Sequence, residues 1–223
     1  MEHCLHFYNP ESHSPIPCTF AGMYLLTFWE NIIQWDRSVF ETINGDWANP
    51  FFDVVMPFLR NSLTWGPLYL FLLVFVMMNY KEKGLWWVVF FLATVALTDM
   101  TGTYVFKYQF MRERPCRDPE MFEHVRLVLK ECGGGYSFVS NHAANHFGMA
   151  VFFFITFRHR FRKWAWAGLA WAALIAFAQV YIGVHFPLDV ICGALLGVAF
   201  GIATGTFFNK RFGFAIFDHQ PVA

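Results

Sequence analysis

The sequence predicts an all-α integral membrane protein, a bundle of five or six transmembrane helices with an amphipathic N-terminal region. The 223 residues are 57% hydrophobic and only 14% charged, which is too apolar for an ordinary soluble domain of this length. The apolar residues also lie in long runs, several of which approach the ~20 residues that a helix needs to cross hydrocarbon. Short clusters of charged residues separate these runs.

Five runs are predicted to span the membrane. In order along the chain, they are Ser62–Met78, Gly84–Phe106, His142–Phe157, Trp164–Val184 and Leu188–Phe208. The formal net charge is zero, and neither a basic surplus nor a recognisable motif indicates a nucleic-acid partner.

Residues 1–60 are predicted to form an interfacial region that precedes the bundle. Ala21–Trp35 mixes apolar residues with polar ones, which is typical of an amphipathic helix lying in the membrane interface. Asn49–Leu59 is apolar but too short to cross the bilayer alone. If Ala21–Trp35 crosses, the bundle has six spans and the N-terminus lies inside; otherwise it has five and the N-terminus lies outside.

The Lys and Arg clusters predict the orientation of the spans. When the second span runs outward, the clusters Lys81–Lys83, Arg158–Lys163 and Lys210–Arg211 all fall on one side, which the positive-inside rule makes the cytoplasm. Residues 61–209 are then the membrane domain and 210–223 a cytoplasmic tail. We expect a multi-pass protein of the inner (cytoplasmic) membrane, with the segment Lys107–Asn141 facing the periplasm.

Three polar islands interrupt the apolar background at the outer ends of predicted spans. They are Lys107–Pro115, Ser137–His142 and Tyr181–Asp189. Because all three fall at one level of the membrane and on one side of it, we expect their side chains to meet in a single site.

The islands have the composition of a phosphate site. Lys107 and Arg114 carry permanent positive charges, and an arginine can hold two phosphate oxygens at once. Asn141 and Pro187 each open a helix, whose free N–H groups and dipole favour an anion. Ser140 adds a hydroxyl donor.

Two histidines and an aspartate supply the groups for catalysis in this site. Of His142 and His185, one can attack phosphorus while the other gives a proton to the leaving oxygen. Asp189 follows His185 by four residues, so near a helix start its carboxylate can reach the imidazole, orient it and stabilise its cation.

The islands resemble the signature of the type 2 phosphatidic acid phosphatase superfamily, K-x6-R-P, P-S-G-H and S-R-x5-H-x3-D. The resemblance covers about residues 60–208. The matching positions are Lys107, Arg114 and Pro115 in the first motif, Ser140 and His142 in the second, and His185 and Asp189 in the third.

The chain departs from this signature at four positions. Val139 and Asn141 replace the proline and glycine of the second motif, and Ala178 and Gln179 replace the Ser-Arg pair of the third. The last change removes a cation that the family pattern places on the phosphate, and Gln179 can donate a hydrogen bond but carries no charge. Arg112 and Arg117 flank Arg114 and are candidates to replace that charge.

The resemblance implies a two-step reaction that needs no metal and no cofactor. His185 forms a phosphohistidine, while His142 protonates the leaving oxygen and then activates water. The developing negative charge is stabilised by Lys107, Arg114, Ser140 and Asn141. The implied substrate is the phosphomonoester or diphosphate headgroup of a lipid: undecaprenyl diphosphate, lipid A phosphate or a phospholipid phosphate. A lipid-to-lipid phosphotransferase and a non-catalytic protein that binds or transports lipid phosphates are the alternatives.

A few residues outside the motifs also invite an interpretation. Asp99 lies inside a predicted span, where a carboxylate usually has a partner: either a polar residue of another span or, beneath the site, Gln179. His146 follows His142 by four residues and is interpreted as a polar residue of that helix face rather than a metal ligand.

The cysteines and glycines add two further expectations. Cys116 and Cys132 lie in the same outer segment and can close it with a disulfide, and Cys4 and Cys18 are a second candidate pair. Glycines recur every fourth residue from Gly193 to Gly205, which indicates close helix packing within the protein or between copies.

Overall fold

The computed structural model describes residues 20–214, with side chains from residue 26 onward, and every regular element within these bounds is a helix. Cys4 and Cys18 lie outside the described residues. The chain divides into two compact units, Met1–Ser38 and Val39–Ala223, and each is described by itself. Helix α1 (Phe20–Glu41) contains the predicted helix at Ala21–Trp35 and extends from the first unit to the start of the second.

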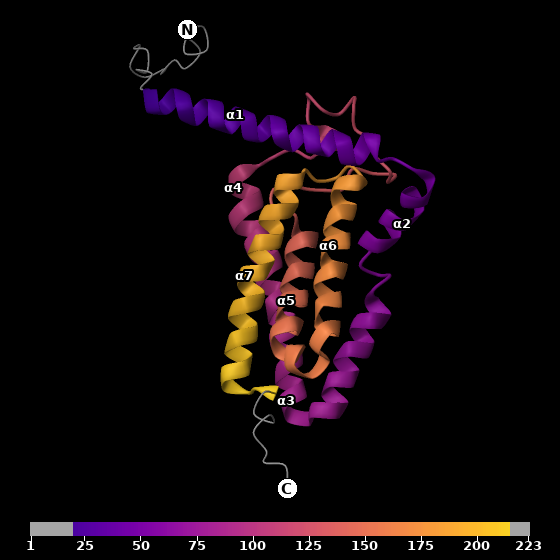
Figure 1. Ribbon diagram of the computed structural model, residues 1–223, viewed down its shortest axis with the longest axis vertical. Helices are drawn as coiled ribbons and strands as arrows, with labels where there is room; N and C mark the ends of the chain where they lie inside the picture. Colours follow the sequence, from indigo (N-terminus) through magenta and orange to yellow (C-terminus); the bar gives the residue numbers. More distant parts are fainter. Residues whose placement is uncertain (1–19, 215–223) are drawn as a thin grey trace. The chain divides into compact units, whose positions relative to one another are not determined.

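Four long helices build the second unit: α3 (Gly66–Met100), α5 (Asn141–Phe161), α6 (Ala165–Tyr181) and α7 (Pro187–Arg211). They run side by side, and the shorter α2 (Pro50–Arg60) precedes them (Figure 1). The remaining elements are short: η2 (Thr42–Asp46), η3 (Thr101–Lys107), α4 (Tyr108–Phe110), η4 (Pro115–Arg117) and η5 (Arg162–Trp164).

Three segments of the described chain are long and apolar enough to cross a membrane: Gly66–Arg117, Asn141–Tyr181 and Pro187–Arg211. The first contains a break at Lys81, where φ is 50°, and the second a break at Arg162, where φ is 48°. The protein is therefore a multi-pass, all-helical membrane protein. A count of five spans, with reversals at these two breaks, stays a prediction.

Aromatic side chains fill the end of the bundle where α5 ends, away from the polar islands. Trp87 of α3 is fully buried against Phe152 and Phe157 of α5, with ring centroids 5.3 and 5.4 Å apart. Its indole Nε1 donates to Thr156 Oγ1 at 2.9 Å. Within an apolar bundle such polar contacts join helices that dispersion alone holds weakly.

The glycines of α7 lie against α5 of the same chain. A Cβ atom at Gly197 would overlap the carbonyl oxygen of Ala144, and one at Gly201 would lie 2.8 Å from the carbonyl oxygen of Gly148. The two backbones therefore approach more closely than any larger side chain allows. This contact holds the first turns of α5 and α7, which carry two of the polar islands, next to each other.

A network of polar groups fixes α2 and the segment that contains Arg126 to the end of α6. Asp53 of α2 accepts hydrogen bonds from Arg126 Nη1 at 2.6 Å and from the Tyr181 hydroxyl at 2.8 Å. Asn44 donates to the carbonyl oxygens of Arg126 and Tyr181 at 2.9 and 2.7 Å. The chain then turns at Gly183, whose φ of +87° suits glycine and whose Cβ would lie 3.0 Å from Arg126 O.

Candidate active site

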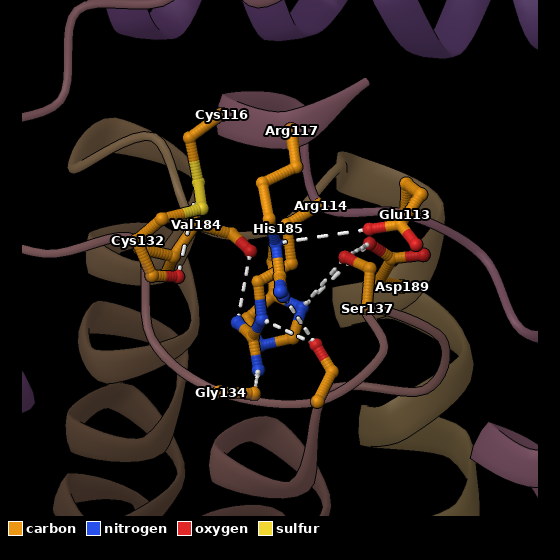
Figure 2. The surroundings of a disulfide bond; sticks show 11 residues. Glu113, Arg114, Cys116, Arg117, Cys132, Gly134, Ser137, Val184, His185 and Asp189 are labelled. Carbon is orange, nitrogen blue, oxygen red and sulfur yellow. Dashed lines mark hydrogen bonds and ion pairs between the residues drawn. A yellow bond between two sulfur atoms is a disulfide. The ribbon is translucent and has the colours of Figure 1, made fainter. Parts of the chain in front are cut away.

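The third island forms the centre of the site, and a serine joins its histidine to its aspartate. His185 Nδ1 lies 3.2 Å from Ser137 Oγ, and this hydroxyl donates to Asp189 Oδ2 at 2.5 Å. The direct distance between His185 Nδ1 and Asp189 Oδ2 is 3.6 Å. Figure 2 shows the three side chains pointing toward one another. Ser137 therefore completes a hydrogen-bonded chain from imidazole to carboxylate.

The first turn of α7 positions Asp189. Pro187 begins the helix, and the Asp189 carboxylate bends back to accept the Phe186 N–H at 2.9 Å. Its other oxygen accepts from Arg112 Nη1 at 2.8 Å, and the Ser140 N–H donates to the Asp189 carbonyl at 2.9 Å. The carboxylate is fully buried, and the Arg112 guanidinium and the Phe186 N–H satisfy its negative charge.

Arg114 occupies the opposite side of the imidazole. Its Nη1 lies 3.2 Å from His185 Nε2 and also donates to the Val184 carbonyl at 3.1 Å. The rest of the guanidinium donates to the carbonyls of Gly134 and Gly135 at 2.9 and 3.1 Å. Because a guanidinium only donates, Nε2 of His185 is the accepting nitrogen and Nδ1 carries the proton.

This environment keeps His185 neutral. Burial lowers its pKa to about 4, with the charges of Arg114 and Lys107 acting in the same direction and Asp189 acting against them. A neutral imidazole with its lone pair on Nε2 is the form that attacks phosphorus.

We expect His185 to stay unprotonated from pH 7 down to pH 5 and to titrate only near pH 4. The ¹⁵N imidazole signals of labelled protein, assigned by their loss in His185→Asn, measure this without any substrate. An ordinary titration near pH 6.5 would contradict the role of burial.

His142 reaches the site from the start of α5. Ser140 caps this helix, with its Oγ accepting the Ala143 N–H at 3.5 Å. The His142 side chain interacts electrostatically with His185 and lines a cavity of about 450 Å³. The other lining residues are Pro57, Arg60, Asn61, Ser62 and Leu129.

His146, one turn after His142, uses both ring nitrogens in hydrogen bonds. Its Nδ1–H donates to the His142 carbonyl at 2.7 Å, and Nε2 accepts from the Tyr69 hydroxyl at 3.1 Å. It therefore supports the backbone that carries His142.

The side chains of Lys107 and Asn141 bind partners on different sides of the site. Lys107 Nζ donates to the Tyr136 carbonyl at 2.8 Å, next to Ser137, and interacts electrostatically with His185. The Asn141 side chain turns away from the histidines, toward α3 and η3, and donates to Thr103 Oγ1 at 2.8 Å. The backbone of Asn141 begins α5, so its N–H belongs to the free donors at this helix start.

Asp99 is paired with α5. Its Oδ1 accepts from Asn141 Nδ2 at 2.9 Å and from Asn145 Nδ2 at 3.2 Å, which is the first of the two arrangements considered for this carboxylate. Gln179 is not its partner. The Gln179 side chain is fully buried, and neither its nitrogen nor its oxygen has a hydrogen-bond partner within residues 26–214.

Cys116 and Cys132 form a disulfide with their Cα atoms 6.0 Å apart, and it lies beside Arg114 (Figure 2). The glycines that follow Cys132 supply the carbonyls that hold the Arg114 guanidinium. The disulfide therefore anchors the loop that orients this cation.

Replacing both cysteines by serine is expected to lower the Tm by roughly 5–10 °C, because a crosslink closing ~15 residues contributes about 3 kcal/mol. Affinity for inorganic phosphate should fall as well, since Arg114 loses its fixed acceptors. Thermal unfolding and phosphate titration measure both effects. Cys192→Ser is the matched control, and a double variant indistinguishable from it would refute a role for this crosslink.

Two residues of the site, Ser137 and Arg60, were not singled out from the sequence, and a third, Arg112, has a partner that was not predicted. Ser137 lies in the second island, but nothing in its spacing indicates that it bridges His185 and Asp189. Arg112, one of two candidates to replace the missing charge, instead binds Asp189, and its guanidinium lies 4.1 Å from the centroid of the Phe186 ring. Arg60 comes from outside the three motifs, so only the folded chain reveals it.

An all-helical membrane bundle that holds a buried histidine between an arginine and a serine-linked carboxylate is the arrangement expected of a membrane phosphatase. Residues 84–212 match the PAP2 superfamily, and the chain belongs to this family.

Curated relatives carry phosphatase names. The chain is 31% identical over 188 residues to a lipid A 4'-phosphatase of Porphyromonas gingivalis, covering 83% of this chain and 76% of that protein. It is 32% identical over 134 residues to an undecaprenyl-diphosphatase of Sulfolobus acidocaldarius, covering 60% of this chain and 58% of that protein.

Two solved structures share the fold. LpxE of Aquifex aeolicus aligns with a TM-score of 0.55 and 28% identity, covering 75% of this chain and 92% of that one. A PAP2-type phosphatidylglycerolphosphate phosphatase of Bacillus subtilis aligns with a TM-score of 0.59 and 22% identity, covering 81% of this chain and 88% of that one. The latter likeness concerns the fold alone.

Proposed function

We propose that this protein hydrolyses the phosphate of a lipid headgroup at the outer face of the inner membrane, with lipid A phosphate as the leading substrate and undecaprenyl diphosphate as the next. The observation that carries the proposal is the chain His185–Ser137–Asp189, with Arg114 at the nucleophilic nitrogen. The lipid A 4'-phosphatase names of two curated relatives support the order of substrates.

In the proposed first step, Nε2 of His185 attacks phosphorus and the bond to the lipid oxygen breaks. The oxygens of the bound phosphate are stronger acceptors than an imidazole, so Arg114 shifts its donors to them and frees the Nε2 lone pair. The proton on Nδ1 remains directed through Ser137 toward Asp189, which stabilises the positive charge forming on the ring.

His142 serves the leaving oxygen. As the general acid, it gives a proton to the lipid alkoxide or leaving phosphate as the bond breaks. In the second step it takes a proton from water, which attacks phosphorus and displaces His185. Lys107, Arg114 and the N–H groups that open α5 stabilise the phosphoryl oxygens in both steps.

An apolar cavity suits the lipid part of the substrate. It has a volume of about 370 Å³ and lies between α3, α5 and α6, lined by residues such as Leu72, Met149 and Phe153. Tyr69 and Trp171 also line it and contact His146, which bonds the His142 carbonyl. An acyl or isoprenoid chain in this cavity would place its headgroup beside the histidines.

The distribution of charge supports an outward-facing site. The starts of α5 and α7 lie at one end of the bundle, and the turn between α5 and α6 and the end of α7 lie at the other (Figure 1). The second end carries the compact clusters Arg158–Lys163 and Lys210–Arg211, which the positive-inside rule favours in the cytoplasm.

The test is phosphate release by the detergent-purified full chain, in the presence of a chelator, from lipid A, undecaprenyl diphosphate and phosphatidylglycerol phosphate. Chelator-resistant release, greatest from lipid A, is the expected result. Release that requires a divalent metal would overturn the mechanism. Consumption of substrate with no free phosphate, and with label appearing in a second lipid, would identify a phosphotransferase instead.

A further inference from the structure

The site lacks one cation that the family pattern places on the phosphate. Gln179 stands where that pattern has arginine, and it is buried and uncharged. The two arginines beside Arg114 are committed to other partners. Arg112 pairs with Asp189, and Arg117 donates to the Gly135 carbonyl at 2.6 Å and pairs with Glu113.

Arg60, the last residue of α2, brings a positive charge to the same site. It lines the cavity of about 450 Å³ together with His142. The positive charge of Arg60 also acts on both His142 and Arg114. A cation that shares a cavity with the proposed proton donor is well placed to meet a phosphate oxygen.

The Arg60 guanidinium has unused hydrogen-bonding capacity. Its Nε is buried and has no hydrogen-bond partner in the part of the chain that the structure describes. Burial also lowers the pKa of Arg60, because the charged guanidinium loses part of its hydration. A buried donor without a partner is unfavourable, and a phosphate oxygen in the cavity would satisfy it.

The fold holds Arg60 in place from outside the catalytic motifs. Two turns before it, Asp53 is bound by Arg126 and by the Tyr181 hydroxyl. Tyr181 ends α6, the helix that leads into the turn with His185. Thus α2, which lies outside the matched residues 84–212, is tied to the same framework as the nucleophile.

We propose that Arg60 binds an oxygen of the substrate's phosphate group on the side of His142 and supplies the charge that Gln179 does not. The proposal rests on the proposed function for the identity of the substrate, but binding of phosphate tests it without turnover. Arg60 would act on the equatorial or leaving oxygens, where negative charge grows as the lipid departs.

The first experiment is titration of the purified full chain with inorganic phosphate, with binding measured as the rise in the Tm of the protein. Arg60→Gln should weaken phosphate binding by roughly ten- to a hundredfold, the effect of losing a charge-assisted hydrogen bond, and Arg60→Lys should restore part of it. Arg158→Gln, a neutralised arginine at the far end of α5, is the matched control and should bind as the native protein does.

Turnover then separates this proposal from the proposed function. If the native protein releases phosphate from lipid A, Arg60→Gln should lower kcat/KM by a similar factor while Arg158→Gln leaves it unchanged. Equal phosphate affinity in native protein and Arg60→Gln would overturn the role of Arg60, whatever the turnover shows. Weakened phosphate binding without lipid hydrolysis by the native protein would instead retain Arg60 as an anion ligand and refute the phosphatase.

Discussion

His185→Ala is expected to reduce phosphate release by at least about a thousandfold, because removing a nucleophile leaves only the catalysis from binding and charge stabilisation. Substrate binding should change little, since Arg114 keeps its carbonyl partners at Val184, Gly134 and Gly135. Single-turnover release from lipid A, measured beside the KM of the native protein, tests both parts.

A second histidine variant provides the matched control. His124 lies in the outer segment and is exposed, so His124→Ala should leave turnover and Tm unchanged. Acid-labile radioactive phosphate attached to the native protein, and absent from His185→Ala, would identify the covalent intermediate. Turnover above one-tenth of the native rate in His185→Ala would exclude His185 as the nucleophile.

Asp189→Asn is expected to lower kcat by about a thousand- to ten thousandfold with little change in KM, as when the orienting acid beside a catalytic histidine is neutralised. The amide can still accept the Phe186 N–H, so α7 keeps its first turn. It no longer carries the charge that stabilises the imidazolium, and it leaves Arg112 without its ion pair.

Measuring kcat, KM and phosphate affinity together distinguishes support of His185 by Asp189 from a purely structural role of Asp189. Asp118→Asn, in the outer segment, is the matched control for loss of a carboxylate. If Asp189→Asn lowered phosphate affinity and kcat by the same factor, Asp189 would be shaping the anion site rather than supporting His185.

The helices were predictable because a membrane imposes simple rules on sequence. Apolar runs bounded by Lys and Arg placed all the bundle helices, and the breaks at Lys81 and Arg162 fall in the predicted charged loops. Helix ends were less exact: the first predicted span begins at Ser62, whereas α3 begins at Gly66. Hydropathy varies too gradually to fix a terminus that depends on local hydrogen bonds.

The motif residues of the site were predictable because each sits at a helix end with a fixed spacing. The links between islands were not. Ser137 joins His185 to Asp189 because its loop crosses the start of α7. This contact is long-range, and no periodic pattern in the sequence indicates it. Arg60 depends on α2 being tied to Tyr181 across 128 residues of sequence from Asp53.

The close approach of α5 and α7 makes the glycines on the contact face of α7 intolerant of substitution. Gly193 faces the Ser140 carbonyl, and Gly197 faces that of Ala144, so a larger residue on α7 displaces the turn that carries His142. Glycines that touch no substrate then set the spacing between the proposed proton donor and nucleophile. In a saturation screen for growth, these two glycines should be as intolerant of substitution as the histidines, whereas the lipid-facing neighbours Ile191 and Leu195 accept many residues.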